Sequence, residues 1–510
     1  MNATWWRPLL TVALFSVLPF AVFVNDNRAY LDPGAILGPF VLALLAAGVL
    51  TVVAADRLGG PPARERSAVV FAAVAFLLFQ FRFARSIAEI ASDSDLVAFV
   101  VWLALFAVAV AVAIRISKNV LAWNYAVVAG ALLLALPVGQ YALFKLTAET
   151  PDQGGDAVQV NLASSAEAPP DVYFFLLDGY GRADQLERAI SFDNAPFLEQ
   201  LERRGFEVAE RATAAYPVTF LSSASTLSMG YPAEPGGLDD YVDFFDSVGG
   251  DNQAVEAFRR LGYQFAFGSD YSSFECGERV DVCIEPSREG IEGFDGEKEA
   301  AILGATPLST LLPALGMHFS SLDGYLTPEA VVEQVAERRS DDPLLAYFHL
   351  LTPHPPYRYL EGCELRQDLT DPGLDDWGIA TETGGEEYAR AARCVNRSLL
   401  PAIDAIKERD PNAIIVLQGD HGPKFGMEFH RPLSDWPRDQ LDLRYSILNA
   451  QRLPPGCGLD EPGAQSSVNT FRTILGCITG EDVPLLPPRE LMIDLEAAEV
   501  EEVDPPAGRP

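Results

Sequence analysis

Two apolar segments of the chain end in residues that can bind a metal ion. Residues 171–177 lead into Asp178, and residues 413–419 lead into Asp420 and His421. Each unbroken apolar run predicts a strand that is buried on both faces of a sheet. An Asp-Gly pair alone is typical of a simple turn, but ligands of open α/β sheets bind beyond the carboxyl ends of the strands. Two such ends carrying carboxylates and an imidazole therefore indicate one shared metal site.

Thr219 lies at the start of a predicted helix, and its hydroxyl has two possible roles. Leu221, Ala224 and Leu227 follow it at helical spacing. The hydroxyl could cap the helix by accepting a hydrogen bond from a free backbone amide. If it instead touches a cation, it could act as a nucleophile at the positive end of the helix dipole. The sequence leaves both interpretations open.

Four of the five histidines lie at predicted strand ends or in the loops that follow them. His349 and His354 belong to a buried strand and its Pro-rich loop, and His421 follows Asp420. His430 and Arg444 lie in residues 422–444, a Gly/Pro/Asp-rich segment that we expect to form a moving flap over the site. A single histidine is usually an ordinary polar residue, but four in such positions indicate metal binding or proton transfer.

Charge divides the chain into two parts. Residues 1–150 contain 10 Lys/Arg and 8 Asp/Glu, which gives a net charge of +2. Residues 151–510 contain 27 Lys/Arg and 63 Asp/Glu, which gives a net charge of -36. The second part is large enough for a core of its own. Its acidity argues against a nucleic-acid partner, because a polyanion would be repelled.

The first part contains five apolar stretches, and an α-helix needs about 20 residues to cross a bilayer. We expect a transmembrane domain of about five helices over residues 1–146 and a linker over 147–169. An extracytoplasmic catalytic domain is expected over 170–482, followed by an acidic, Pro-rich tail over 483–510 that is exposed or disordered. The excess of Lys and Arg in the loops after the second and fourth stretches places the acidic domain outside a cell membrane. The stretches are residues 8–24, 36–55, 68–81, 96–114 and 121–144.

All six cysteines lie in the acidic part, and their even number in an exported domain indicates disulfide bonds. No CxxC spacing indicates a zinc finger. Many pairings are possible, and sequence proximity favours three of them: Cys276–Cys283, Cys363–Cys394 and Cys457–Cys477.

Strand and helix patterns alternate through the acidic part. Residues 171–177 form a predicted strand, residues 194–205 have helical spacing with a terminal glycine, and residues 206–209 again resemble a strand. This alternation predicts a mostly parallel central sheet with helices on both faces.

Taken together and in order, these motifs resemble the alkaline phosphatase superfamily. The motifs are Leu-Leu-Asp178-Gly, a threonine that starts a helix about forty residues later, His349 to Tyr357, and Asp420-His421-Gly. The closest resemblance is to the sulfatase-like branch that includes lipoteichoic acid synthases and phosphoethanolamine transferases. It covers about residues 170–480, and it implies an alkaline phosphatase-like fold behind a helical membrane domain.

The resemblance also implies roles for individual residues. Asp178, Thr219, Asp420 and His421 would bind one divalent cation, with Thr219 as the nucleophile that forms a phospho-threonine intermediate. His354 would contact the transferred group, while His349, His430 and Arg444 would contact the substrate. The ligand types favour Zn²⁺ or Mn²⁺, and Mg²⁺ and Ca²⁺ remain alternatives.

The implied activity is phosphoryl-group transfer or hydrolysis on membrane lipid or envelope-glycan head groups, such as phosphoglycerol or phosphoethanolamine. Two features depart from the family pattern. A formylglycine sulfatase needs a Cys or Ser followed by Pro and Arg, and Thr219 and the residues after it lack this motif. The residue after Asp-His-Gly is often Glu in the family, and it is Pro423 here. Two alternatives remain, a phosphodiesterase or sulfatase acting on soluble esters and a non-catalytic membrane scaffold. The sequence leaves the oligomeric state open.

Overall fold

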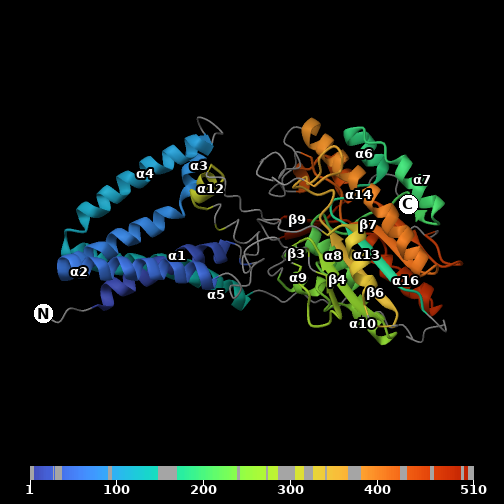
Figure 1. Ribbon diagram of the computed structural model, residues 1–510, viewed down its shortest axis with the longest axis horizontal. Coiled ribbons are helices and arrows are strands. Elements are labelled where there is room, and N and C mark those ends of the chain that lie inside the picture. Colours follow the sequence, from blue (N-terminus) through green and yellow to red (C-terminus); the bar gives the residue numbers. More distant parts are fainter. Residues whose placement is uncertain are drawn as a thin grey trace. The chain divides into compact units, whose positions relative to one another are not determined.

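The computed structural model divides into two compact units, which are described separately (Figure 1). The first comprises residues 1–149 and 291–321, and the second comprises residues 150–290 and 322–510. The structure describes residues 5–26, 28, 37–89, 95–147, 169–237, 242–271, 274–284, 286, 302, 305–314, 326–338, 340, 342–365, 381–425, 433–459, 465–494 and 499–503.

The first unit consists of helices, four of which are long and apolar enough to cross a membrane, judged by length and composition. These four are α1, α2, α4 and α5, while α3 is too short to span. The helices are α1 (Trp6–Asp26), α2 (Leu37–Leu78), α3 (Phe81–Glu89), α4 (Asp95–Ile116) and α5 (Val120–Thr147).

Helix α2 folds back on itself at Gly60, which has a non-helical φ of 68° and precedes two prolines. A Cβ atom on Gly48 would lie 2.8 Å from the ring of Phe71. In a straight helix these two residues would be about 35 Å apart. The second and third apolar stretches of the sequence are therefore the two arms of one hairpin, and the number of membrane spans stays a prediction.

Residues 291–321, which belong to the acidic part of the sequence, cluster with the first, helical unit. Ile302 packs with Phe20 and Val24 of α1, and the Ala305 carbonyl accepts a hydrogen bond of 3.3 Å from the Phe81 amide. Helix α12 (Leu308–Ala314) follows. Residues 291–321 thus cluster with the helices rather than with the catalytic domain in which the sequence analysis placed them.

The second unit is built on a seven-stranded sheet in the order β2-β8-β7-β1-β6-β4-β5. Strand β1 lies at the centre and pairs in parallel with both β6 and β7, while β8 pairs antiparallel with β7. The predicted mostly parallel sheet is therefore confirmed. Its strands are β1 (Val172–Leu177), β2 (Glu207–Val208), β4 (Gln264–Ser269), β5 (Val282–Ile284), β6 (Leu344–Leu350), β7 (Ile414–Gly419) and β8 (Asn449–Arg452).

Helices cover both faces of this sheet, as Figure 1 shows. On one face Phe175 belongs to a core cluster with residues of α6, α7, α13 and α14. On the other face Phe174 stacks on Phe471 of α16, and Gln418 of β7 contacts Thr226 of α8 and Thr470 of α16. The covering helices are α6 (Ala183–Ile190), α7 (Ala195–Arg203), α8 (Thr219–Ser228), α10 (Gln253–Arg260), α13 (Pro328–Ala336), α14 (Thr381–Arg409) and α16 (Thr470–Thr479).

The described residues of the expected tail form strands instead of being disordered, and they are only partly exposed. Strands β9 (Leu491–Asp494) and β10 (Glu499–Glu502) pair antiparallel, and β10 also pairs with β3 (Gly236–Gly237). Leu491, Met492 and Ile493 of β9 and Val500 of β10 are apolar and buried, so this segment packs against the domain in spite of its many prolines and acids.

The three disulfide bonds join the cysteines that sequence proximity favoured. Their Cα atoms lie 5.3–6.0 Å apart, within the usual range for a disulfide. The bonds are Cys276–Cys283, Cys363–Cys394 and Cys457–Cys477.

Candidate active site

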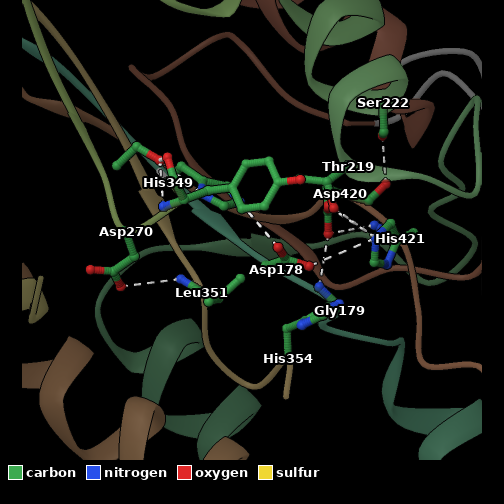
Figure 2. A network of polar contacts seen from close by, with 12 residues as sticks. Asp178, Gly179, Thr219, Ser222, Asp270, His349, Leu351, His354, Asp420 and His421 are labelled. Atoms are coloured by element: carbon green, nitrogen blue, oxygen red, sulfur yellow. Dashed lines mark hydrogen bonds and ion pairs between the residues drawn. The ribbon is translucent and has the colours of Figure 1, made fainter. Parts of the chain in front are cut away.

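Parallel register brings together the ends of three neighbouring strands. Leu177 of β1 is level with Gly419 of β7 and with Leu350 of β6. Asp178 and Asp420, which come directly after Leu177 and Gly419, therefore leave the sheet side by side. His349 lies one residue before the end of β6, and Figure 2 shows its side chain next to the two carboxylates.

Thr219 is the first residue of α8, and it does not cap that helix. Val218 occupies the N-cap position, and no side chain makes a capping hydrogen bond there. The capping interpretation is therefore wrong. The Thr219 Oγ1 atom instead lies 3.1 Å from His421 Nε2. Thr219 is half-buried.

His421 turns one defined nitrogen toward the carboxylates. Its Nδ1 atom lies 3.2 Å from the Gly422 carbonyl, which accepts the Nδ1 hydrogen. The lone pair is then on Nε2, which lies 3.2 Å from Asp420 Oδ2 and 3.7 Å from Asp178 Oδ1. Burial and, after it, the Arg444 guanidinium hold the pKa of His421 well below its ordinary value. A neutral imidazole in this orientation is suited to bind a metal.

The two carboxylates leave buried oxygen atoms without hydrogen-bond donors. Asp420 Oδ1 accepts the amides of Gly179 and His421, both at 2.8 Å. Asp420 Oδ2, Asp178 Oδ1 and His349 Nε2 are buried and have no hydrogen-bond partner among the described residues. Burial, and then the Asp178 carboxylate, raise the pKa of Asp420. Each of Asp178, His349 and Asp420 offers one ligand atom, and these three atoms lie within 4.8 Å of one another. Such a group fits a divalent cation, since its charge would offset two buried carboxylates.

His349 lies with the candidate metal ligands, whereas the sequence analysis assigned it to the substrate. It is fully buried, and its Nε2 atom is 3.3 Å from Asp178 Oδ2. Its Nδ1 atom is 3.1 Å from the hydroxyl of Ser269, the last residue of β4. A fully buried side chain in this position can hold a cation or orient Asp178, but it offers little surface to a substrate.

His354 borders the same site from the loop after β6. Its backbone amide donates a hydrogen bond of 3.0 Å to the Asp178 carbonyl, and its Nδ1 atom donates to the Pro355 carbonyl. Burial lowers the pKa of the half-buried His354, while the Asp178 carboxylate acts in the opposite direction. His430, the other expected substrate contact, lies outside the described residues.

Arg444 belongs to a helix instead of the loop expected over residues 422–444. The described part of that region ends in α15 (Arg438–Tyr445), and Arg444 is buried in it. Its guanidinium donates to the carbonyls of Pro217 and Gly422. These carbonyls belong to the two segments that carry Thr219 and His421. Arg444 therefore connects those segments, so a positioning role accounts for its contacts.

Two polar residues, Tyr388 and Ser222, hold the backbone of the site by hydrogen bonds, and no sequence motif predicted them. The Tyr388 hydroxyl donates to the Gly179 carbonyl at 2.9 Å and accepts the Gly181 amide at 3.0 Å, which holds the turn after Asp178. The Ser222 hydroxyl donates to the Asp420 carbonyl at 2.6 Å (Figure 2). Both residues lie on helices remote in sequence from their partners. Nothing in their local sequence distinguishes them from other buried hydroxyl residues.

Glycines on both sides of Asp420-His421 allow close backbone approach. A Cβ atom on Gly419 would lie 2.3 Å from the Tyr180 carbonyl oxygen, and one on Gly422 would lie 2.0 Å from that of Leu443. Any side chain would push these backbones apart. This packing explains why the Asp-His pair has a glycine before and after it.

Comparison with known proteins identifies the class of enzyme. The sequence profile of the sulfatase family matches residues 193–478, which is more than half of the chain. The chain therefore belongs to the sulfatase family and is an enzyme. A search of curated proteins found no match.

The solved structures to which the chain is similar include an integral membrane transferase. One is the zinc complex of the C-terminal periplasmic domain of EptC from Escherichia coli, with 12% identity over 62% of this chain and 84% of that chain and a TM-score of 0.38. Another is lipooligosaccharide phosphoethanolamine transferase A from Neisseria meningitidis, with 13% identity, coverage of 92% and 95%, and a TM-score of 0.40. A third is a phosphonate monoester hydrolase from Agrobacterium radiobacter, with 14% identity, coverage of 63% and 80%, and a TM-score of 0.37. At these scores the likeness decides neither substrate nor metal.

Arg444→Gln is expected to lower kcat by about 10- to 100-fold, because small displacements of reacting groups have effects of this size. The KM should change little, since the contacts of Arg444 are to backbone carbonyls. Arg444→Lys should restore only part of kcat, because an ammonium group cannot reproduce the guanidinium geometry. Steady-state kinetics on the purified enzyme measure both constants. Arg438→Gln, on the same helix, is the control, and a raised KM at unchanged kcat would instead favour a substrate contact.

Proposed function

We propose that this protein is a membrane-anchored, metal-dependent phosphoryl-group transferase or hydrolase that acts on head groups of cell-envelope lipids or glycans. The observation that carries the proposal is the position of the Thr219 hydroxyl. It is half-buried and lies 3.1 Å from His421 Nε2, at the edge of a cluster of buried carboxylates. A hydroxyl next to a cation site is the arrangement that nucleophilic phosphoryl transfer needs.

Asp178, Asp420 and His421 would hold the cation together with Thr219, and His349 is a further candidate ligand. Their mixture of carboxylate and imidazole favours Zn²⁺ or Mn²⁺ over Mg²⁺ or Ca²⁺. When bound, a divalent cation would lower the pKa of the threonine hydroxyl and offset charge on the phosphoryl oxygens.

The proposed reaction has two steps at phosphorus. Thr219 Oγ1 loses its proton and forms a bond to phosphorus while the bond from phosphorus to the leaving oxygen breaks. The leaving oxygen takes up a proton, and the product is a phospho-threonine that still carries the head group. An acceptor hydroxyl then attacks phosphorus and the threonine oxygen leaves, or water does so in a hydrolysis. His354 is proposed to contact the phosphoryl group, because it borders the cluster and is half-buried.

Two features support a site close to lipid outside the cell membrane. Four helices in the first unit are apolar and long enough to span a bilayer. Three disulfide bonds in the second unit suit an oxidising compartment. A membrane anchor would keep the catalytic residues near lipid-borne donors.

Sulfate-ester hydrolysis is the alternative that the family name raises. The segment Thr219-Phe-Leu-Ser-Ser lacks the Cys or Ser, followed by Pro and Arg, that a formylglycine sulfatase needs. This departure disfavours that route. A non-catalytic scaffold is also disfavoured. It would not require a half-buried threonine beside buried carboxylate and imidazole groups that can bind a metal ion and lack hydrogen-bond partners among the described residues.

The test compares head-group release from phosphatidylglycerol and phosphatidylethanolamine with cleavage of a soluble aryl phosphodiester and an aryl sulfate. The full chain in detergent is used, with Zn²⁺ or Mn²⁺ added, and diacylglycerol is the measured lipid product. We expect at least one phospholipid to react faster than both soluble esters. Faster turnover of the aryl sulfate would contradict the proposal, and equal turnover of the soluble phosphodiester would remove its lipid specificity.

A further inference from the structure

The helical unit contains a hollow that is separate from the residues of the candidate active site. We call it the α2–α4 hollow, and its volume is about 440 Å³. It is bounded mainly by the second arm of α2 and the end of α4, and Thr51 of the first arm of α2 also lines it. Most of its wall is apolar and two cations border it; the residues that matter here are Arg66, Val70, Phe71, Val74, Ile114 and Lys118.

The two cations approach the hollow from different elements. Arg66 comes from α2, and Lys118 comes from the turn between α4 and α5. Both are exposed, and neither makes an ion pair or a side-chain hydrogen bond within the described residues. Arg64, two residues before Arg66, differs from them because it pairs with Asp56 at 3.2 Å. The hollow thus has two positive groups whose charge is not neutralised by the protein.

The remaining wall continues from the cations as an apolar track. Arg66, Val70 and Val74 lie on successive turns of one helix face and extend over about 12 Å. Ile114 precedes Lys118 by four residues, close to one turn. The Ser117 hydroxyl at this wall donates to the Ile114 carbonyl at 2.8 Å, so its hydrogen is already used. Anion binding in the hollow therefore falls to Arg66 and Lys118.

We propose that the α2–α4 hollow binds one anionic glycerophospholipid. Its phosphate would lie between Arg66 and Lys118, and one acyl chain would follow Val70, Val74 and Ile114. Charge complementarity and the apolar walls select this occupant, because the helices that form the hollow are candidate membrane spans. Basic pockets between membrane helices on the cytoplasmic side are suited to anionic head groups.

This lipid differs from the substrate of the proposed reaction. Lys118 lies just before α5 begins, whereas residue 150, at which the second unit begins, follows the other end of that 28-residue helix. Arg66 and Lys118 are also among the positive residues that follow the second and fourth apolar stretches of the sequence, and this positive charge predicts a cytoplasmic location. The bound lipid would therefore hold the α2 hairpin against α4, on the side where anionic lipids accumulate.

A general attraction of the positive helix ends for anionic lipid is the main alternative, and the chain offers a matched control. Arg57 and Arg115 are exposed and belong to the same two loop regions, but neither lines the hollow. The double variant Arg57→Gln/Arg115→Gln changes the net charge as much as Arg66→Gln/Lys118→Gln does. A general attraction would make the two double variants equivalent.

The experiment is native mass spectrometry of the full chain, titrated with dioleoyl-phosphatidylglycerol or with dioleoyl-phosphatidylcholine as the zwitterionic probe. The intact chain should bind one phosphatidylglycerol more tightly than further copies and more tightly than phosphatidylcholine. Arg66→Gln/Lys118→Gln should weaken this first binding by about tenfold or more, since each basic group near a membrane surface contributes about 1 kcal/mol. The Arg57/Arg115 control should change it by less than about twofold.

Val74→Trp tests the acyl-chain part without changing any charge. It should also weaken the first phosphatidylglycerol by about tenfold, because the indole would occupy space along the apolar track. This variant keeps the test decisive if the charge variant does not fold. Equal loss in the Arg57/Arg115 control, or unchanged binding in Val74→Trp, would overturn the proposal. Neither result depends on turnover, so failure here leaves the proposed function unaffected.

Discussion

Thr219→Ala is expected to lower turnover by about 10³-fold or more, the scale of losing a catalytic nucleophile. The alanine removes the oxygen that lies 3.1 Å from His421 Nε2 and leaves the start of α8 intact, because Val218 is the N-cap residue. Thr219→Ser keeps a hydroxyl at this position and should retain measurable activity. Head-group release from phospholipid measures turnover in each variant.

Intact-protein mass spectrometry gives a second readout of the same residue. Wild-type protein quenched during turnover should carry one added phosphoryl-linked head group, mapped to Thr219, and Thr219→Ala should carry none. Ser228→Ala is a suitable control, because Ser228 is a half-buried hydroxyl at the other end of α8. Turnover in Thr219→Ala within a few-fold of the control would rule out the threonine as nucleophile.

Asp420→Asn is expected to remove bound metal and with it most of the activity. Asparagine can still accept the Gly179 and His421 amides through Oδ1, but it presents an uncharged amide group where Oδ2 now lies. Metal affinity should fall by more than the 10- to 100-fold typical of losing an outer-shell partner. Elemental analysis measures metal content, and chelator treatment of wild type followed by added Zn²⁺ or Mn²⁺ should abolish and then restore turnover.

Thermal stability distinguishes a metal ligand from a merely structural carboxylate. Burial and Asp178 raise the pKa of Asp420, so two neighbouring carboxylates destabilise the metal-free protein. Metal-free Asp420→Asn should therefore melt at a higher temperature than metal-free wild type, yet gain nothing from added metal. Asp404→Asn is the control, because the Asp404 carboxylate, which lies on α14, forms an ion pair with Arg204. A variant that melts lower and still binds metal would contradict the assignment.

Local sequence patterns were sufficient to predict the two central strands that lead into Asp178 and Asp420. The runs before Asp178 and Asp420 are almost entirely apolar and lead into glycine-containing turns, so they predicted the two central strands. Cysteine spacing likewise indicated the disulfide pairs. The disulfide bonds join cysteines that are close in sequence, and the two strands are buried along their whole length, so short sequence patterns were enough to predict them.

Other features depend on contacts that no local pattern records. Whether Thr219 caps α8 depends on the backbone at Val218, and the role of Arg444 depends on two carbonyls brought together by the packing of α15. The association of residues 291–321 with the helices depends on side chains such as Ile302 finding an apolar partner far away in the chain.

Residue types and their order were therefore enough to indicate strands, a parallel sheet and a set of metal-type ligands, because periodicity and composition act within a few residues. The convergence of those ligands required the strand order and the register that sets Leu177 level with Gly419 and Leu350. Register is established by hydrogen bonds and packing between segments more than a hundred residues apart. Those interactions exist only after the chain has folded.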